Sequence, residues 1–148
     1  MKKFMVASDH AGIKVKKKAI KVLENLNIPY YDCSPKNTKD DDYPDFAKVV
    51  GDEVNSVPER LGLLVCGSGI GMSIAANKVK GIRAALVHEK KDAELARKHN
   101  DANILILKGW KNYSDSELKA IIKTFVTTKF EGSRHKRRID KIRLIEYS

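Results

Sequence analysis

The residues best suited to chemistry form one short stretch, Cys-Gly-Ser-Gly-Ile-Gly at positions 66–71. Its three glycines let the backbone turn tightly and direct several N–H groups toward one spot. The apolar run at 61–65 predicts a buried strand before it, and residues 70–78 predict a helix after it. N–H groups at the start of a helix bind anionic oxygen, and a thiol beside them can act as a nucleophile or a base. The stretch therefore indicates an enzyme for a small substrate that carries or develops negative charge.

The glycine pattern differs from two common nucleotide-binding loops. Its third glycine comes one residue too early for the dinucleotide fingerprint, which also belongs after the first strand of its fold. No Gly-Lys-Ser/Thr follows, so the phosphate loop of nucleotide triphosphatases is excluded as well. A purely structural glycine turn stays open, and so does a buried and unreactive Cys66.

Other candidate groups lie far from this stretch in the sequence. Asp9 and His10 directly follow an apolar run and could form an acid–base pair, or an N-cap with a surface histidine. His99 lies near the end of a helical pattern, where it could give a proton to a sugar oxygen or only complement the helix dipole. Arg134 and Arg138 are four residues apart, so on a helix they share one face and could grip a phosphate, or form a solvated basic tail.

Strand and helix patterns alternate along the chain and predict which of these groups meet. Strands are expected at 2–8, 28–33, 61–65, 82–87 and 104–107, and helices at 11–26, 45–54, 70–78, 90–99, 114–127 and about 134–146. This order predicts a Rossmann-like three-layer α/β/α fold around a five-stranded, mostly parallel sheet. Ligands in such sheets bind beyond the carboxyl ends of the strands, so Asp9, His10 and Cys66 are expected on one rim.

Composition sets the class of protein. A chain of 148 residues is expected to form one domain over residues 1–148, and no apolar run approaches the length of a membrane span. Two cysteines give no disulfide framework, which favours a cytoplasmic protein. The net charge of +10 favours anionic partners. The chain has neither zinc spacing nor aromatic residues interleaved with basic ones, so a small anion is favoured over nucleic acid or a membrane.

Two other classes remain open from these residues. In a thiol hydrolase, Cys66 would attack an acyl or phosphoryl centre with His10 or His99 as its base. In a non-enzymatic module, the basic surface would bind nucleic acid or phosphate without turnover.

Six stretches together make the chain similar to a known family. They are SDHAG at 8–12, DYPD at 42–45, CGSGIGMSIAANK at 66–78, GIRAA at 81–85, HNDAN at 99–103 and RHKRR at 134–138. The chain resembles the ribose-5-phosphate isomerase B family, which also includes galactose-6-phosphate and allose-6-phosphate isomerases. The resemblance implies an aldose–ketose isomerase of carbohydrate metabolism that needs no metal or other cofactor. It also implies a homodimer or a dimer of dimers, with active sites shared between chains.

The resemblance implies a role for each candidate residue. Cys66 would be the base that moves a proton between the first two sugar carbons, and His99 the acid that helps to open the furanose ring. Asp9 and His10 would bind the ring and its hydroxyls, with Asp9 also among the catalytic groups. The remaining expected ligand contacts are the loop residues Gly67, Ser68, Gly69, Ile70 and Gly71 around the enediolate oxygen, with Ser68 also catalytic, and Asn100, Arg134 and Arg138, the arginines on the phosphate.

The chain departs from the family pattern in ways that bear on the substrate. Many members carry a ligand-contacting arginine in a Gly-x-Arg context where Gly109-Trp110 occurs here, and Lys108 or Lys111 could take its place. Many also have a glycine where Ser133 stands. Ribose 5-phosphate is the expected substrate, and a six-carbon sugar phosphate is the alternative.

Overall fold

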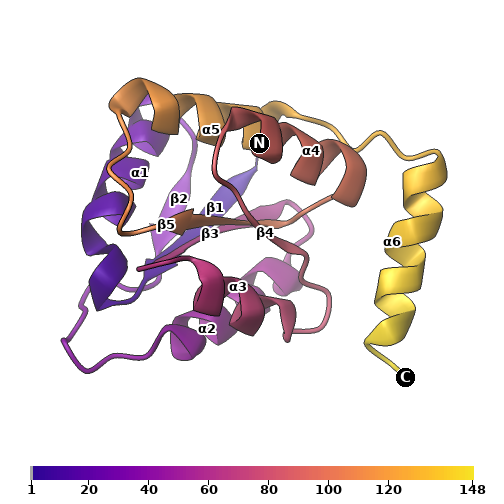
Figure 1. Ribbon diagram of the computed structural model, residues 1–148, viewed down its shortest axis with the longest axis horizontal. Helices are drawn as coiled ribbons and strands as arrows, with labels where there is room; N and C mark the ends of the chain where they lie inside the picture. The colour runs from indigo at the N-terminus through magenta and orange to yellow at the C-terminus, as the bar shows by residue number, and fades with distance from the viewer. Residues whose placement is uncertain (1) are drawn as a thin grey trace.

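The computed structural model describes residues 2–148 and builds them around one sheet (Figure 1). The strands are β1 (Lys3–Ser8), β2 (Tyr30–Asp32), β3 (Arg60–Cys66), β4 (Ala84–Leu86) and β5 (Ile104–Lys108). The helices are α1 (Ile13–Asn25), α2 (Tyr43–Ser56), α3 (Ile70–Asn77), α4 (Lys90–Asn100), α5 (Asp115–Thr127) and α6 (Arg134–Ile145), and a short 3-10 turn, η1 (His10–Gly12), precedes α1.

The sheet has the strand order β2-β1-β3-β5-β4, and every neighbouring pair is parallel. The expected mostly parallel sheet is therefore confirmed. The two outermost strands, β2 and β4, are shorter than predicted, with three residues each. Each of them pairs on one side only, so fewer residues are held in the ladder. The helix expected over 11–26 begins later than predicted, at Ile13, because its first residues form the tighter turn η1.

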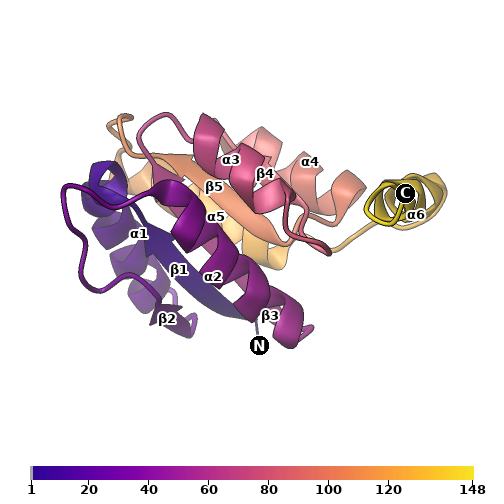
Figure 2. The ribbon, with the colours of Figure 1, turned by 90° about the horizontal axis from the view of Figure 1, so that it is seen from below.

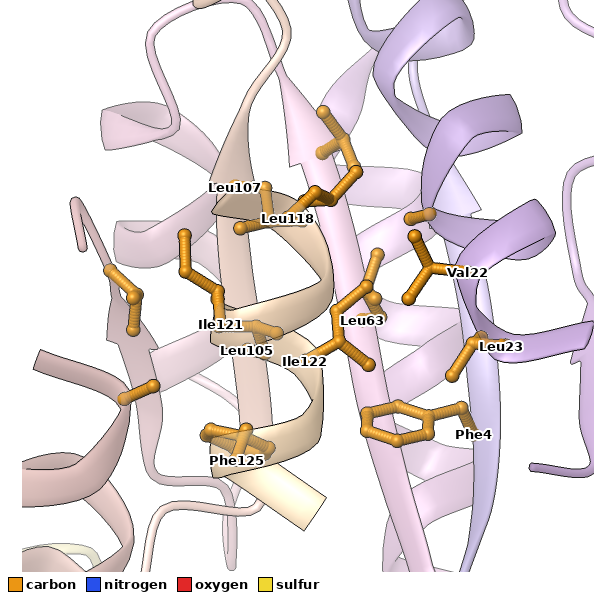
Figure 3. Close-up of a cluster of buried hydrophobic side chains, with 14 of the residues drawn as sticks. Phe4, Val22, Leu23, Leu63, Leu105, Leu107, Leu118, Ile121, Ile122 and Phe125 are labelled. Carbon is orange, nitrogen blue, oxygen red and sulfur yellow. The ribbon is translucent and has the colours of Figure 1, made fainter. Parts of the chain in front are cut away.

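Two apolar layers cover the two faces of the sheet. One contains side chains from α1, α4 and α5, and the other contains side chains from α2 and α3. Figure 3 shows the first layer, where α5 directs Leu118, Ile121, Ile122 and Phe125 at the strands. Side chains of β3 alternate between the layers, since Leu63 and Val65 belong to the first, and Leu64 and Cys66 to the second. Burial on both faces explains why the central strands are apolar throughout.

Helix α6 stands apart from these layers at one end of the molecule, as both views make plain (Figures 1 and 2). It keeps a small buried face, which includes Ile139, and leaves most of its surface exposed. Within residues 2–148, no helix combines the length and the apolar character that crossing a membrane requires.

Gly12 sets the distance between the end of β1 and the end of β3. A β-carbon at this position would lie 2.7 Å from the carbonyl oxygen of Val65, and 2.8 Å from its Cγ1. A side chain here would therefore push η1 off the strand that carries Cys66. The need for close approach, rather than for an unusual backbone angle, fixes this residue as glycine.

We expect Gly12→Ala to lower the free energy of unfolding by about 1–3 kcal/mol, because the added methyl meets backbone that cannot move aside. Urea unfolding monitored by circular dichroism measures the change. The control is Lys14→Ala, an exposed substitution two residues further on, which should leave the midpoint unchanged. Equal midpoints for Gly12→Ala and the wild type would contradict the packing described here.

Candidate functional site

The carboxyl ends of β1 and β3 lie side by side and bring the first candidate residues together. The backbone N–H of Asp9 donates to the carbonyl of Val65 at 3.2 Å, so Asp9 and Cys66 leave neighbouring strands at the same edge. The predicted rim of Asp9, His10 and Cys66 is confirmed. Asp9 caps η1 by accepting the N–H of Ala11 at 3.0 Å. Burial raises the pKa of its carboxyl group, so Asp9 takes up a proton more readily than an exposed aspartate.

The glycine turn links Cys66 to α3 through a tightly packed backbone. Gly69 is the N-cap of α3 and has a φ of 77°, a left-handed angle that favours glycine. The hydroxyl of Ser68 accepts the N–H of Ile70 at 3.1 Å and closes the turn. A β-carbon on Gly71 would lie 2.5 Å from the Tyr43 ring, and one on Gly67 would lie 2.5 Å from the Trp110 indole. An aromatic ring therefore packs against each end of the turn.

Cys66 lies beneath this turn. The residue is only 4% exposed and packs with the layer that includes Met72 of α3. Its side chain is thus on the face of the sheet that α3 covers, the same face as the helix that the glycine turn opens. Its carbonyl accepts the N–H of Gly109 at 2.7 Å, which ties the end of β5 to the turn.

A hollow of about 360 Å³ opens beside the turn. Its lining consists of Gly67, Ser68, Ile70, Lys108, Trp110 and Lys111. Trp110 is 78% exposed and forms one wall. Lys108 and Lys111 both border the hollow, although Lys111 also pairs with Glu117 at 2.7 Å. The hollow offers backbone, an aromatic face and positive charge, which suits a small anionic ligand.

His10 projects at the same edge, half exposed, and is held by the loop before α2. Its backbone N–H donates to Oδ1 of Asp41 at 2.8 Å, and its Nδ1 lies 2.8 Å from the same oxygen. The hydrogen bond to Asp41 raises the pKa of His10, so the ring stays charged to a higher pH than a free histidine.

The second group of candidate residues lies at the opposite edge of the sheet. Helix α4 starts after the carboxyl end of β4 and ends before the amino end of β5, so it carries His99 and Asn100 back across the sheet. The carbonyl of Asn100 accepts from the side chain of Arg83, which directly precedes β4. These contacts place the end of α4 at the amino edge.

The start of α6 joins this second group. The rings of His99 and His135 stack with centroids 4.2 Å apart and an interplanar angle of 14°. His135 is 4% exposed, whereas Arg134 and Arg138 are exposed around it on the same helix. Burial, followed by the charge of His99 and of Arg134, lowers the pKa of His135, so this ring is neutral at pH 7.

His99, Glu131 and His135 are the residues here that could hold a metal, with donor atoms within 4.8 Å of one another. The stack argues against that role. The in-plane lone pairs of two nearly parallel, stacked rings lie in separate planes and do not converge on one ion. The two arginines beside them add positive charge to the same place. The arrangement suits an orienting contact for the His99 ring better than a metal centre.

The chain therefore divides its candidate site into two parts. Cys66, Asp9, His10 and the glycine turn occupy the carboxyl edge, and His99, Asn100, Arg134 and Arg138 occupy the amino edge. A strand of seven residues such as β3 spans about 20 Å, which is too far for one sugar phosphate to bridge. One chain does not bring Cys66 and His99 together.

Four neighbours of these groups received no role from the sequence: Asp41, Tyr43, Trp110 and His135. Tyr43 and His135 do lie inside stretches that match the family, DYPD and RHKRR. Trp110 stood out only as a departure from the Gly-x-Arg pattern. Asp41 gave no signal, because its contact with His10 spans 31 positions.

Comparison with known proteins agrees with this architecture. A family model described as Ribose/Galactose Isomerase matches residues 4–142. A putative sugar phosphate isomerase of Rickettsia typhi is 48% identical over 139 residues, which cover 94% of this chain and 96% of that protein. A probable ribose-5-phosphate isomerase B of Mycoplasma genitalium is 46% identical over 139 residues, covering 93% of this chain and 91% of that protein.

Solved structures give the same result. The crystal structure of ribose-5-phosphate isomerase B from Mycoplasma genitalium with bound ribulose-5-phosphate aligns with a TM-score of 0.90 at 44% identity, covering 99% of this chain and 97% of that one. The Thermotoga maritima ribose 5-phosphate isomerase aligns with a TM-score of 0.90 at 44% identity, covering 96% and 97%. The chain belongs to the ribose/galactose isomerase family, within its ribose-5-phosphate isomerase B branch.

The lowered pKa of His135 predicts that the docking of α6 weakens in acid. The unfolded chain takes up a proton at this histidine near its ordinary value of 6.5, whereas the folded chain resists protonation. The stabilisation is complete above pH 6.5 and is lost as the pH falls below it. Hydrogen exchange of the α6 amides at pH 7.5 and pH 5.5 measures this loss.

After correction for the intrinsic exchange rate at each pH, the α6 amides of the wild type should exchange faster at pH 5.5 than at pH 7.5. In His135→Gln, the difference between the two pH values should be smaller. His88→Gln, at an exposed histidine, is the control and should behave as the wild type does. An undiminished pH effect in His135→Gln would assign the acid sensitivity to another group.

Proposed function

We propose that this protein interconverts ribose 5-phosphate and ribulose 5-phosphate, and that each active site is assembled from two copies of the chain. The observation that carries the proposal is the division of the candidate residues between opposite edges of one sheet. In a symmetric dimer, the carboxyl edge of one copy can face the amino edge of the other, so that two equivalent sites form. The neighbouring structure with bound ribulose-5-phosphate supports a five-carbon substrate.

Helix α6 provides the surface for such an assembly. Several of its apolar side chains are exposed in the single chain, including Leu144 at 69% and Ile145 at 71%. Apolar groups gathered on a projecting helix are typical of a surface that another chain covers. The same helix presents Arg134 and Arg138, so a partner that covers α6 also receives both guanidinium groups.

The residues at the carboxyl edge carry out the proton transfer between the sugar carbons. Cys66, as the thiolate, takes the proton from the carbon next to the carbonyl, and the electron pair left behind forms an enediolate. N–H groups of the glycine turn stabilise the oxygen that gains charge, and one such donor contributes about 3 kcal/mol to lowering the barrier. A proton then passes from the oxygen on the second carbon to the oxygen on the first, and the Cys66 thiol returns its proton to the first carbon, which completes the isomerisation without a net change in oxidation state.

The amino edge of the second copy supplies the other contacts. His99 gives a proton to the ring oxygen and opens the furanose before Cys66 takes the proton from the sugar carbon. The stack with neutral His135 holds the His99 ring in a fixed plane. Arg134 and Arg138 bind the phosphate, and that binding energy holds the reacting carbon at the thiol.

We expect Cys66→Ala to lower kcat by about 10³-fold or more, while ribose 5-phosphate still binds, because the contacts to the phosphate and hydroxyls remain. A coupled assay measures turnover, and calorimetry measures binding. Cys33→Ala is the matched control, since that thiol lies at another strand, where burial raises its pKa to about 11. Near-normal turnover by Cys66→Ala would overturn the assignment of the base.

A mixing experiment tests whether the site is shared. Cys66→Ala and His99→Asn should each be inactive alone, whereas a mixed dimer contains one site with both groups intact. Random subunit exchange makes half of the dimers mixed, so about a quarter of the wild-type activity should return. Different affinity tags on the two variants verify that mixed dimers form. Mixed dimers without activity would contradict a shared site.

A further inference from the structure

Asp41 holds His10 through two hydrogen bonds to one of its carboxylate oxygens. The Oδ1 atom of Asp41 accepts the backbone N–H of His10 at 2.8 Å and lies 2.8 Å from its ring Nδ1. The carboxylate therefore fixes both the backbone and the ring of the same residue. Since Nδ1 is engaged with an acceptor, Nε2 is the ring atom left to meet a ligand.

The other oxygen of Asp41 is anchored in turn. Its Oδ2 accepts the side-chain amide of Asn37 at 2.9 Å and the N–H of Thr38 at 3.1 Å. Asn37 also donates to the carbonyl of Ser8 at 2.7 Å, which pins the loop to the end of β1. All these contacts leave the Asp41 side chain only 12% exposed, so the carboxylate has little freedom to turn away.

We propose that Asp41 is a positioning residue, which orients the imidazolium of His10 so that its Nε2–H points toward the negatively charged sugar phosphate. The proposal rests on the function proposed above and extends it to a residue outside the candidate set. Asp41 does not touch the substrate. It acts by favouring the protonated His10 ring and holding it in one direction at the rim that also carries Asp9 and Cys66.

The surrounding charges agree with this role. The charged groups that act on His10 within residues 2–148 are Asp41, on the loop before α2, and Asp9, on the segment after β1, and both favour the protonated ring. Partial burial opposes ionisation of Asp41, but hydrogen bonds from Asn37, His10 and Thr38 outweigh it and lower the pKa of Asp41. The surroundings therefore favour a carboxylate beside an imidazolium, and they keep the His10 ring protonated to a higher pH than in a free histidine.

NMR titration of the His10 ring in the free protein tests the pair directly, and it does so without reference to turnover. In the wild type, His10 should titrate above its ordinary value of 6.5, and in Asp41→Asn it should shift down toward that value. Asp40→Asn, which removes the same charge from an exposed neighbour in the same loop, should leave the His10 titration unchanged. An unchanged His10 titration in Asp41→Asn overturns the proposal.

Kinetics test the consequence for substrate. At a pH between the His10 pKa values that the NMR titration gives for Asp41→Asn and for the wild type, Asp41→Asn should raise KM for ribose 5-phosphate about tenfold, with kcat within about twofold, because a charge-assisted hydrogen bond to the substrate is lost. In the wild type, KM should begin to rise only above the raised His10 pKa. In the variant, the rise should begin at a lower pH. A fall in kcat at constant KM overturns the positioning role.

Two further variants keep the test decisive. Asp41→Asn introduces a side-chain NH2 group, which competes with the Asn37 and Thr38 donors. Asp41→Ala introduces no such group, and it should give the same changes as Asp41→Asn. In a His10→Asn background, Asp41→Asn should have no added effect on KM, because Asp41 acts through His10. Additive effects in the double variant overturn the proposal.

Absence of isomerase activity in the wild type refutes only the proposed function, because the NMR titration still measures the interaction between Asp41 and His10.

Discussion

The direction of the strands is the constraint on which the rest of the structure depends. Because all five strands are parallel, the chain must return from the carboxyl edge to the amino edge before each new strand. Helix α4 makes that return between β4 and β5 over 11 residues, or about 16 Å, and His99 lies near its end. Cys66, at the end of β3, lies at the other edge. Within one copy, the topology itself separates these two side chains.

Helix α6 crosses the amino edge and is attached at both of its ends. At its start, His135 stacks on His99, and at its end Glu146 accepts the N–H of Gly81 at 3.0 and 3.1 Å. Between these points the helix keeps little contact with the layers, as its separate position in Figure 2 makes visible. Two-point attachment fixes the direction of the helix, so its arginines and its exposed apolar side chains face outward in a defined arrangement. Such an arm suits contact with a second copy of the chain.

Much of the fold could be predicted from local pattern. Apolar runs placed all five strands, and the helix expected over 114–127 is α5, which Ser114 caps by accepting the N–H of Glu117 at 3.1 Å. The shortness of β2 and β4 could not be predicted, because strand length at a sheet edge depends on which neighbour is present. The close approach of Gly12 to Val65 could not be predicted either, because no local pattern contains that contact.

The candidate site could be predicted in part, and for the same reason. The rule that ligands meet the carboxyl ends of strands grouped Asp9, His10 and Cys66, and the structure confirms that grouping. The roles assigned to these residues came from the family resemblance and stay predictions. The supporting contacts of Asp41 and His135 could not be predicted from the sequence, because each joins segments more than 30 positions apart. The spacing of apolar residues predicts which side of a helix or strand packs against its layer, but it does not predict which distant loop contacts that element.

A crystal structure of the protein with ribulose 5-phosphate bound tests the central claim most directly. The account predicts that the first two carbons of the sugar lie beside Cys66 and the glycine turn of one copy, while the phosphate meets Arg134 and Arg138 of the partner subunit. A ligand whose carbons and phosphate are both held by residues of one chain, with no contribution from a second copy, would contradict it.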